Sequence, residues 1–170
     1  MAQIMTFSPT GARISASPGA SIAGIATETT LFSDNIKSNS LVEGKYYGFR
    51  IDLAITTPAL NLSNFTFRIK YGTQVFTLAA AVPLLSSLTL SPITIQGYIV
   101  SRGPANQFIT ATIAQSSGSV LNLSFTNSAM RGTMTVDSTL DQDFSITGQI
   151  GGTGFGSTIV VIDWVLRPDF

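Results

Sequence analysis

Three aspartates, Asp137, Asp141 and Asp143, lie close together in the stretch DSTLDQDFS (137–145). Carboxylates at such spacing could bind a calcium ion or act as an acid–base pair. An EF-hand calcium loop also needs a glycine at its sixth position and a glutamate at its twelfth, and both are missing here. We therefore expect a polar turn whose side chains accept hydrogen bonds from nearby amides before a strand begins. Bound calcium and catalysis are the alternatives.

Most other catalytic chemistry is excluded by composition. The 170 residues include no histidine and no cysteine. The chain therefore cannot build a Ser-His-Asp or Cys-His site, a disulfide or a zinc–cysteine centre. Only lysine-assisted serine or paired-carboxylate chemistry remains open. We expect a protein that is not an enzyme, with no catalytic residue, no cofactor and no metal ligand.

Two further motifs have ordinary structural explanations. The stretch GGTGFGST (151–158) suggests a phosphate-binding loop, but it has no lysine and no third glycine at the required spacing. A strand, and not a helix, is expected to follow it, so we interpret it as a glycine-rich hairpin loop. The single tryptophan, Trp164, shares one face of a strand with Ile162 and Leu166, which favours a core or interface anchor over a sugar-binding platform.

The basic residues also have ordinary explanations. Arg102 and Arg131 each precede a glycine at a turn, where a solvated arginine is commoner than a ligand contact. Arg68 and Lys70 lie on the strand face opposite apolar residues, which is ordinary alternation.

The elements that position these residues are strands, because apolar residues recur with a period of two. In KYYGFRIDLAITT (45–57), Tyr47, Phe49 and Ile51 alternate with polar or small residues. About nine short strands are predicted, including a hairpin that turns at Gly72, which supplies a positive φ. The expected strands are 27–32, 45–57, 63–71 with its hairpin partner ending at 79, 92–101, 107–115, 119–126, 131–136, 144–150 and 157–166.

This pattern predicts an all-β fold, a jelly-roll-like antiparallel β-sandwich of about eight or nine strands with an extended N-terminal arm. An immunoglobulin-like sandwich is the alternative. Residues 1–24 are rich in Gly, Ala, Ser and Pro and are expected to be the arm, and residues 25–170 the sandwich domain. We expect the apolar stretch FTLAAAVPLLSSL (76–88) to be a connection packed on the core or a neighbouring subunit, with one helical turn at 80–88.

The low charge of the chain limits which partners are expected. Only 11% of the residues are charged and the net charge is zero, whereas a typical domain has about 25% charged residues. A nucleic-acid partner is not expected without a basic face, and the apolar runs are too short to span a membrane. Asn61, Asn64 and Asn122 begin Asn-x-Ser/Thr triplets, which we attribute to the abundance of Ser and Thr. Low charge with 44% hydrophobic residues indicates a hydroxyl-rich surface partly covered by partner subunits.

Four stretches together resemble a β-sandwich domain of tailed-phage structural proteins. They are LFSDNIKSNSLVEGKYYGFRIDLAI (31–55), LSNFTFRIKYGTQVFTL (62–78), TMTVDSTLDQDFSITGQI (133–150) and TIVVIDWVL (158–166). The resemblance covers about residues 25–166 and departs from the family at the N-terminal arm and around 76–90. By this resemblance, the aspartate stretch 137–150 corresponds to an acidic turn and strand late in the family's domain. The family has no catalytic residues, so the resemblance implies none in this chain.

The resemblance implies a structural virion protein, made in the host cytoplasm, that cements or decorates the capsid surface. The expected assembly is a homotrimeric jelly roll at the local three-fold positions of the capsid, bound to the major capsid protein and aided by the arm. The alternative is a receptor- or glycan-binding head of a tail or head fibre. It would need exposed aromatic and polar side chains that converge on a loop surface, whereas most aromatic residues here fall on predicted strands.

Overall fold

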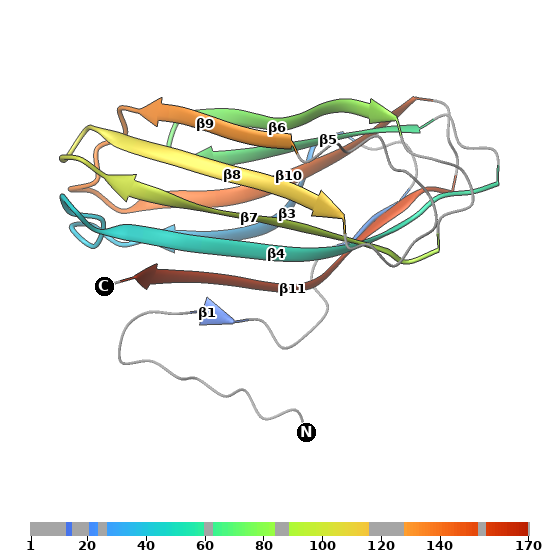
Figure 1. Cartoon of the computed structure of the whole chain (residues 1–170), viewed down its shortest axis with the longest axis horizontal. Helices are drawn as coiled ribbons and strands as arrows, with labels where there is room; N and C mark the ends of the chain where they lie inside the picture. The colour runs from blue at the N-terminus through green and yellow to red at the C-terminus, as the bar shows by residue number, and fades with distance from the viewer. Residues whose placement is uncertain are drawn as a thin grey trace, which may run out of the picture.

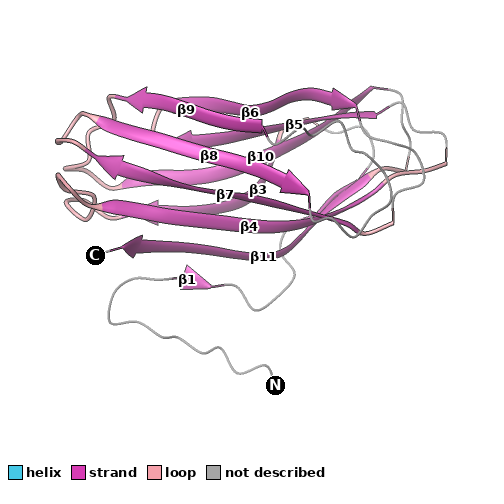
Figure 2. Cartoon of the chain, in the orientation of Figure 1, coloured by secondary structure: helices cyan, strands magenta, loops and turns pink. Residues whose placement is uncertain are grey.

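The computed structural model describes residues 13–14, 21–23, 27–59, 63–83, 89–115, 128–152 and 156–169. These residues form eleven strands in two antiparallel sheets (Figures 1 and 2). The strands are β1 (Arg13–Ile14), β2 (Ser21–Ala23), β3 (Thr29–Ile36), β4 (Tyr46–Thr56), β5 (Ser63–Tyr71), β6 (Gln74–Pro83), β7 (Ser91–Ser101), β8 (Gln107–Gln115), β9 (Ser128–Met134), β10 (Gln142–Gly152) and β11 (Thr158–Asp169). The predicted jelly-roll-like antiparallel β-sandwich is confirmed. Among the described residues there is no helix of the length and hydropathy needed to cross a membrane.

The larger sheet has the strand order β1-β11-β4-β7-β8-β9, and β2 also pairs with β11. The smaller sheet has the order β3-β10-β5-β6. Strands far apart in the sequence are therefore neighbours. The last strand, β11, pairs with β4 along its length, with Trp164 opposite Ile51 and Leu166 opposite Phe49. The connection between β5 and β6 is the predicted tight turn, in which Gly72 has a φ of 52°.

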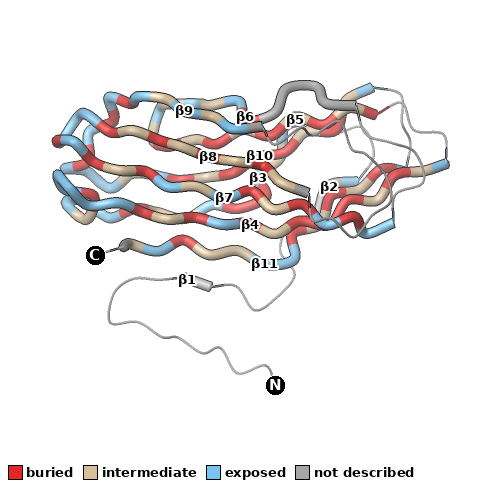
Figure 3. Tube along the Cα trace, in the orientation of Figure 1, coloured by how far each residue is buried: buried red, intermediate tan, exposed pale blue. Residues whose placement is uncertain are grey.

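The core fills the space between the two sheets. Buried residues alternate with more exposed ones along strands such as β4, β5 and β7 (Figure 3). Four aromatic rings connect the layers. Phe144 of β10 lies 5.0 Å, between ring centroids, from Phe49 of β4 and 6.0 Å from Phe32 of β3. Phe32 in turn packs on Trp164 at 4.3 Å. The expectation of a core anchor at Trp164 agrees with this contact.

The apolar stretch 76–88 is expected to be a connection, but its residues 76–83 belong to a strand. Residues up to Pro83 belong to β6, so the expected helical turn at 80–88 is wrong for its first four positions, and 84–88 lie outside the described residues. Pairing with β5 overrides the weak strand preference of alanine. Pro83 is tolerated because it ends an edge strand, where a missing N–H leaves no ladder bond unmade. The strand expected at 119–126 also lies outside the described residues.

The N-terminal residues that the structure describes extend the larger sheet beyond β11. Arg13 and Ile14 are the register partners of Leu166 and Val165, and β2 pairs with the other end of β11 at 158–160. The edge of β11 therefore carries a partner at both ends. The division of the chain into an arm and a sandwich at residue 24 stays a prediction.

Glu28 attaches the segment before β3 to the outer face of the smaller sheet. Its carboxylate accepts hydrogen bonds from Lys70 Nζ at 2.7 Å and from Thr147 Oγ1 at 2.6 Å, and Arg68 Nη1 lies 3.3 Å away. The hydrogen bond from Lys70, followed by that from Thr147, lowers the pKa of Glu28.

We expect Glu28 to make the stability of the folded protein depend on pH in the acidic range. The pKa of Glu28 is lower in the folded than in the unfolded chain. Its contribution to the free energy of unfolding is therefore present at pH values above the pKa of the unfolded chain, and it is lost as the pH falls through the pKa of the folded chain. The melting temperature of Glu28→Gln should therefore fall less than that of the wild type between about pH 5 and about pH 3. An unchanged pH profile in the variant would contradict this role, and Glu43→Gln, in an exposed loop, is the matched control.

Candidate functional site

The outer face of the larger sheet carries the polar and aromatic side chains that the core excludes. On β4, Tyr46 and Arg50 point outward and alternate with buried Tyr47 and Phe49. On β7, Gln96 and Tyr98 are exposed between core residues. These side chains form rows across the sheet, because Gln96 is the register partner of Arg50 and Tyr98 is the partner of Gly48.

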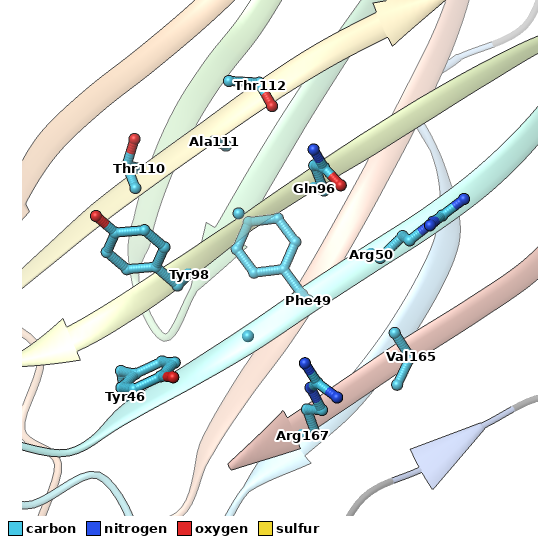
Figure 4. Close-up of a pocket in the computed structure, with 12 residues that line it drawn as sticks. Tyr46, Phe49, Arg50, Gln96, Tyr98, Thr110, Ala111, Thr112, Val165 and Arg167 are labelled. Atoms are coloured by element: carbon cyan, nitrogen blue, oxygen red, sulfur yellow. The ribbon is translucent and has the colours of Figure 1, made fainter. Parts of the chain in front are cut away.

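A groove of about 680 Å³ crosses this face over the central strands (Figure 4). Its size is within the range of ligand-binding clefts. The lining combines aromatic rings with hydrogen-bonding groups. The lining residues are Tyr46, Gly48, Phe49, Arg50, Gln96, Gly97, Tyr98, Thr110, Ala111, Thr112, Val165 and Arg167. We call it the outer groove.

Two tyrosines stand at one end of the outer groove. The rings of Tyr46 and Tyr98 lie edge to face with 6.2 Å between centroids, and the side chains are 37% and 45% exposed. Gly48 lies between Tyr46 and Arg50 along β4 and has no side chain, which leaves the sheet hollow beside the rings. In Figure 4, Gln96 and Arg50 lie toward the other end, with Thr110 and Thr112 along one side.

An ion pair holds the guanidinium of Arg50 in place. Arg50 Nε donates to Asp52 Oδ2 at 2.8 Å and Nη2 donates to Oδ1 at 3.0 Å. The Oδ1 atom also accepts a hydrogen bond from Thr94 Oγ1 at 2.5 Å. The hydrogen bond to Asp52 raises the pKa of Arg50. The groove thus contains a charged group that is already oriented before any ligand arrives.

Two acidic side chains of this face lie beside one another. Asp52 and Asp163 are register partners on β4 and β11, which gives a pair of neighbouring carboxylates. Asp163 is exposed, and Asp52 is held by Arg50 and Thr94. Both are acceptors for hydrogen bonds.

The aspartates of the opening motif lie away from the outer groove and fasten loops together. Asp141 accepts hydrogen bonds from Lys37 Nζ at 2.7 Å and from the Ser38 N–H at 2.8 Å, and these bonds lower its pKa. Asp137 accepts from the Oγ1 and the N–H of Thr139, which likewise lowers its pKa.

The third aspartate, Asp143, accepts a hydrogen bond from Asn35 Nδ2 at 3.2 Å. Within the described part of the chain, no three acidic side chains are grouped in a way that could hold a metal ion. These contacts agree with the polar turn that the sequence indicates.

The remaining predicted candidates are dispersed. The guanidinium of Arg102 lies 5.1 Å from the ring centroid of Phe108. Arg131 is the register partner of Thr110 at the side of the outer groove. The glycine-rich stretch lies between β10 and β11, and its residues 153–155 lie outside the described residues, as do Asn61 and Asn122.

Sequence reasoning missed the residues of the outer groove, above all Tyr46, Tyr98 and Gln96. A signal was present, because the alternation that places Tyr47 and Phe49 in the core places Tyr46 on the opposite face. In the same way, Tyr98 precedes the core residue Ile99. A glycan-binding surface is expected at loops, whereas the period of two also separates the aromatic residues of strands into inward and outward sets.

No protein-family model matches the chain, and no curated protein matches its sequence. Among solved structures, it is similar to peanut lectin with a nine-residue peptide, at 8% identity and a TM-score of 0.45, covering 96% of this chain and 94% of the lectin. Lectin I from Ulex europaeus, in complex with the methyl glycoside of α-L-fucose, gives 10% identity and a TM-score of 0.49, with 92% and 91% covered. The CBM2 module of the evolved Dit of Lactobacillus casei BL23 phage J-1 has 14% sequence identity and a TM-score of 0.29. The match covers 79% of this chain and 66% of that module. All three TM-scores are below 0.5, and none of these proteins assigns a function to this chain.

Proposed function

We propose that the protein is a non-catalytic glycan-binding β-sandwich that holds a carbohydrate in the outer groove. The main support for this proposal is the exposed pair of tyrosines, Tyr46 and Tyr98, beside a hollow lined by guanidinium, amide and hydroxyl groups. A sugar ring has apolar C–H faces and a hydroxyl edge. Tyrosine rings match the faces, because each offers an apolar body with a polar tip. Gln96, Arg50 and the two threonines match the hydroxyls.

The groove also lies on a rigid part of the fold. Its lining residues come from β11, β4, β7 and β8, which are successive neighbours in the larger sheet, with one register shift in the pairing of β11 with β4, between Val161 and Asp163. A site on paired strands loses little conformational entropy when a ligand binds. This supports recognition of a weakly interacting, hydroxyl-rich ligand.

The test is Tyr98→Ala, measured by binding of the purified protein to an array of glucans, mannans, galactans, xylans and bacterial cell-wall polysaccharides, followed by calorimetry. We expect the wild-type protein to bind at least one polysaccharide class. We expect the variant to bind it about tenfold more weakly or worse, since truncation of an aromatic anchor costs more than about 1 kcal/mol.

Leu140→Ala is the matched control, because Leu140 is also a large exposed side chain but lies in the loop before β10. Its affinity should equal that of the wild type, and both variants should keep the wild-type melting temperature. An equal loss of binding in the control, or no binding of any polysaccharide by the wild type, would reject the proposal.

A second candidate is the capsid cement or decoration protein suggested by the phage resemblance, a homotrimer bound to the major capsid protein. The pairing of β1 and β2 with β11 supports it, because a terminal segment that adds strands to a sheet edge could also do so between subunits. Immunogold labelling of virions separates the candidates. Label on head facets favours cement, and label on fibre or tail tips favours a glycan-binding head.

A further inference from the structure

A second hollow, of about 290 Å³, lies beside the outer groove on the same face. It is lined by Arg50, Asp52, Asp163, Trp164 and Val165. Two of these residues, Arg50 and Val165, also line the outer groove, and they are register partners on β4 and β11. The two hollows therefore meet at this residue pair.

Together the hollows extend along β4 from Tyr46 to Asp52. Strand residues rise by about 3.3 Å each, so this stretch of β4 is about 20 Å long. A single sugar ring would occupy only a fraction of that length. The strand runs straight through both hollows without an interruption in its pairing to β7.

The two ends of this path offer different chemistry. The tyrosine end provides aromatic faces. The other end provides two carboxylates on neighbouring strands, with Asp52 oriented by Arg50 and Thr94. The Oδ1 of Asp163 accepts the N–H of Trp164 at 2.7 Å. Carboxylates are strong acceptors for hydroxyl donors, so this end is suited to the hydroxyl edge of a sugar.

We infer that the ligand is an extended glycan chain of several sugar units laid along β4, with one end at Tyr46 and Tyr98 and the other at Asp52 and Asp163. This inference rests on the proposed function and specifies its ligand class. A terminal monosaccharide would fill one hollow and leave the second without a role.

The experiment uses the polysaccharide class that binds on the array, cut into a series from monosaccharide to hexasaccharide, with affinities measured by calorimetry on the full chain. We expect affinity to rise with chain length up to the size that fills both hollows. Asp163→Ala should weaken binding of the hexasaccharide about tenfold, through loss of a charge-assisted hydrogen bond, and leave disaccharide binding at the tyrosine end unchanged.

Asp143→Ala is the matched control, because it removes an exposed carboxylate with one side-chain hydrogen bond on the other sheet. Asp163→Asn serves as a second variant, and melting temperatures check the fold of each. Equal affinity for monosaccharide and hexasaccharide, or an unaffected hexasaccharide affinity in both Asp163 variants, would overturn the extended chain while glycan binding itself stands. Absence of binding to every polysaccharide would overturn both.

Discussion

Replacement of Phe144 by alanine is expected to lower the free energy of unfolding by about 3–5 kcal/mol, the usual range for loss of a buried phenylalanine. Phe144 is fully buried and belongs to β10, between β3 and β5 in the smaller sheet. Its ring contacts Phe49 of the larger sheet and Phe32 of its own sheet. The variant would leave a cavity at the centre of the core, where the two paired sheets cannot close over it.

The measurement is equilibrium denaturation in guanidinium chloride, with the midpoint and slope compared between variants. Val75→Ala is the control, since Val75 is 55% exposed on β6 and should change stability by less than about 0.5 kcal/mol. A loss in Phe144→Ala as small as that of the control would show that the aromatic contacts between the sheets do not hold the sandwich together.

Gly97→Ala is expected to lower the free energy of unfolding by about 3 kcal/mol or more, which is the upper end of the usual cost of inserting extra atoms into a packed core. A Cβ at this position would lie 2.1 Å from the carbonyl oxygen of Thr110, 2.8 Å from Ala111 Cα and 2.7 Å from Phe49 Cζ. Two of these atoms belong to the backbone of β8, which cannot move without breaking its pairing with β7. The glycine is therefore required by the close approach of two strands.

Gly132→Ala gives the matched comparison. There the three atoms nearest to the added Cβ all belong to the ring of Phe76, the first of them at 2.5 Å, and this partly buried side chain can rotate or shift. We expect a loss of about 1 kcal/mol. Equal losses in the two glycine variants would mean that the sheet adjusts its backbone as readily as a side chain, contrary to the expectation for Gly97.

Local sequence was sufficient for the central strands β4, β5, β7 and β8 and for the turn at Gly72. The period of two identifies which residues of β4 are buried, and glycine is the residue that adopts a positive φ without strain. The extent of β6 could not be predicted in the same way, because alanines have no clear strand preference and the pairing with β5 decides their conformation.

The candidate site was harder to predict, because it depends on which strands are neighbours. Tyr46 and Tyr98 are far apart in the chain and meet only because β4 pairs with β7. The partners of Asp141 are equally non-local, since Lys37 and Ser38 precede β4. Spacing along the chain identifies a concentration of carboxylates, but the surrounding fold decides that they bind lysine and amide groups.

The alternation of inward and outward residues on β4 and β7 separates two properties of the molecule. Inward residues such as Ile51 and Ile95 are buried and carry the stability, whereas outward ones such as Tyr98 and Gln96 line the outer groove. Surface exchanges usually alter stability by no more than about 0.5 kcal/mol. Exchanges at the outward positions of β4 and β7 can therefore change the chemistry of the outer groove while leaving the fold nearly as stable as before.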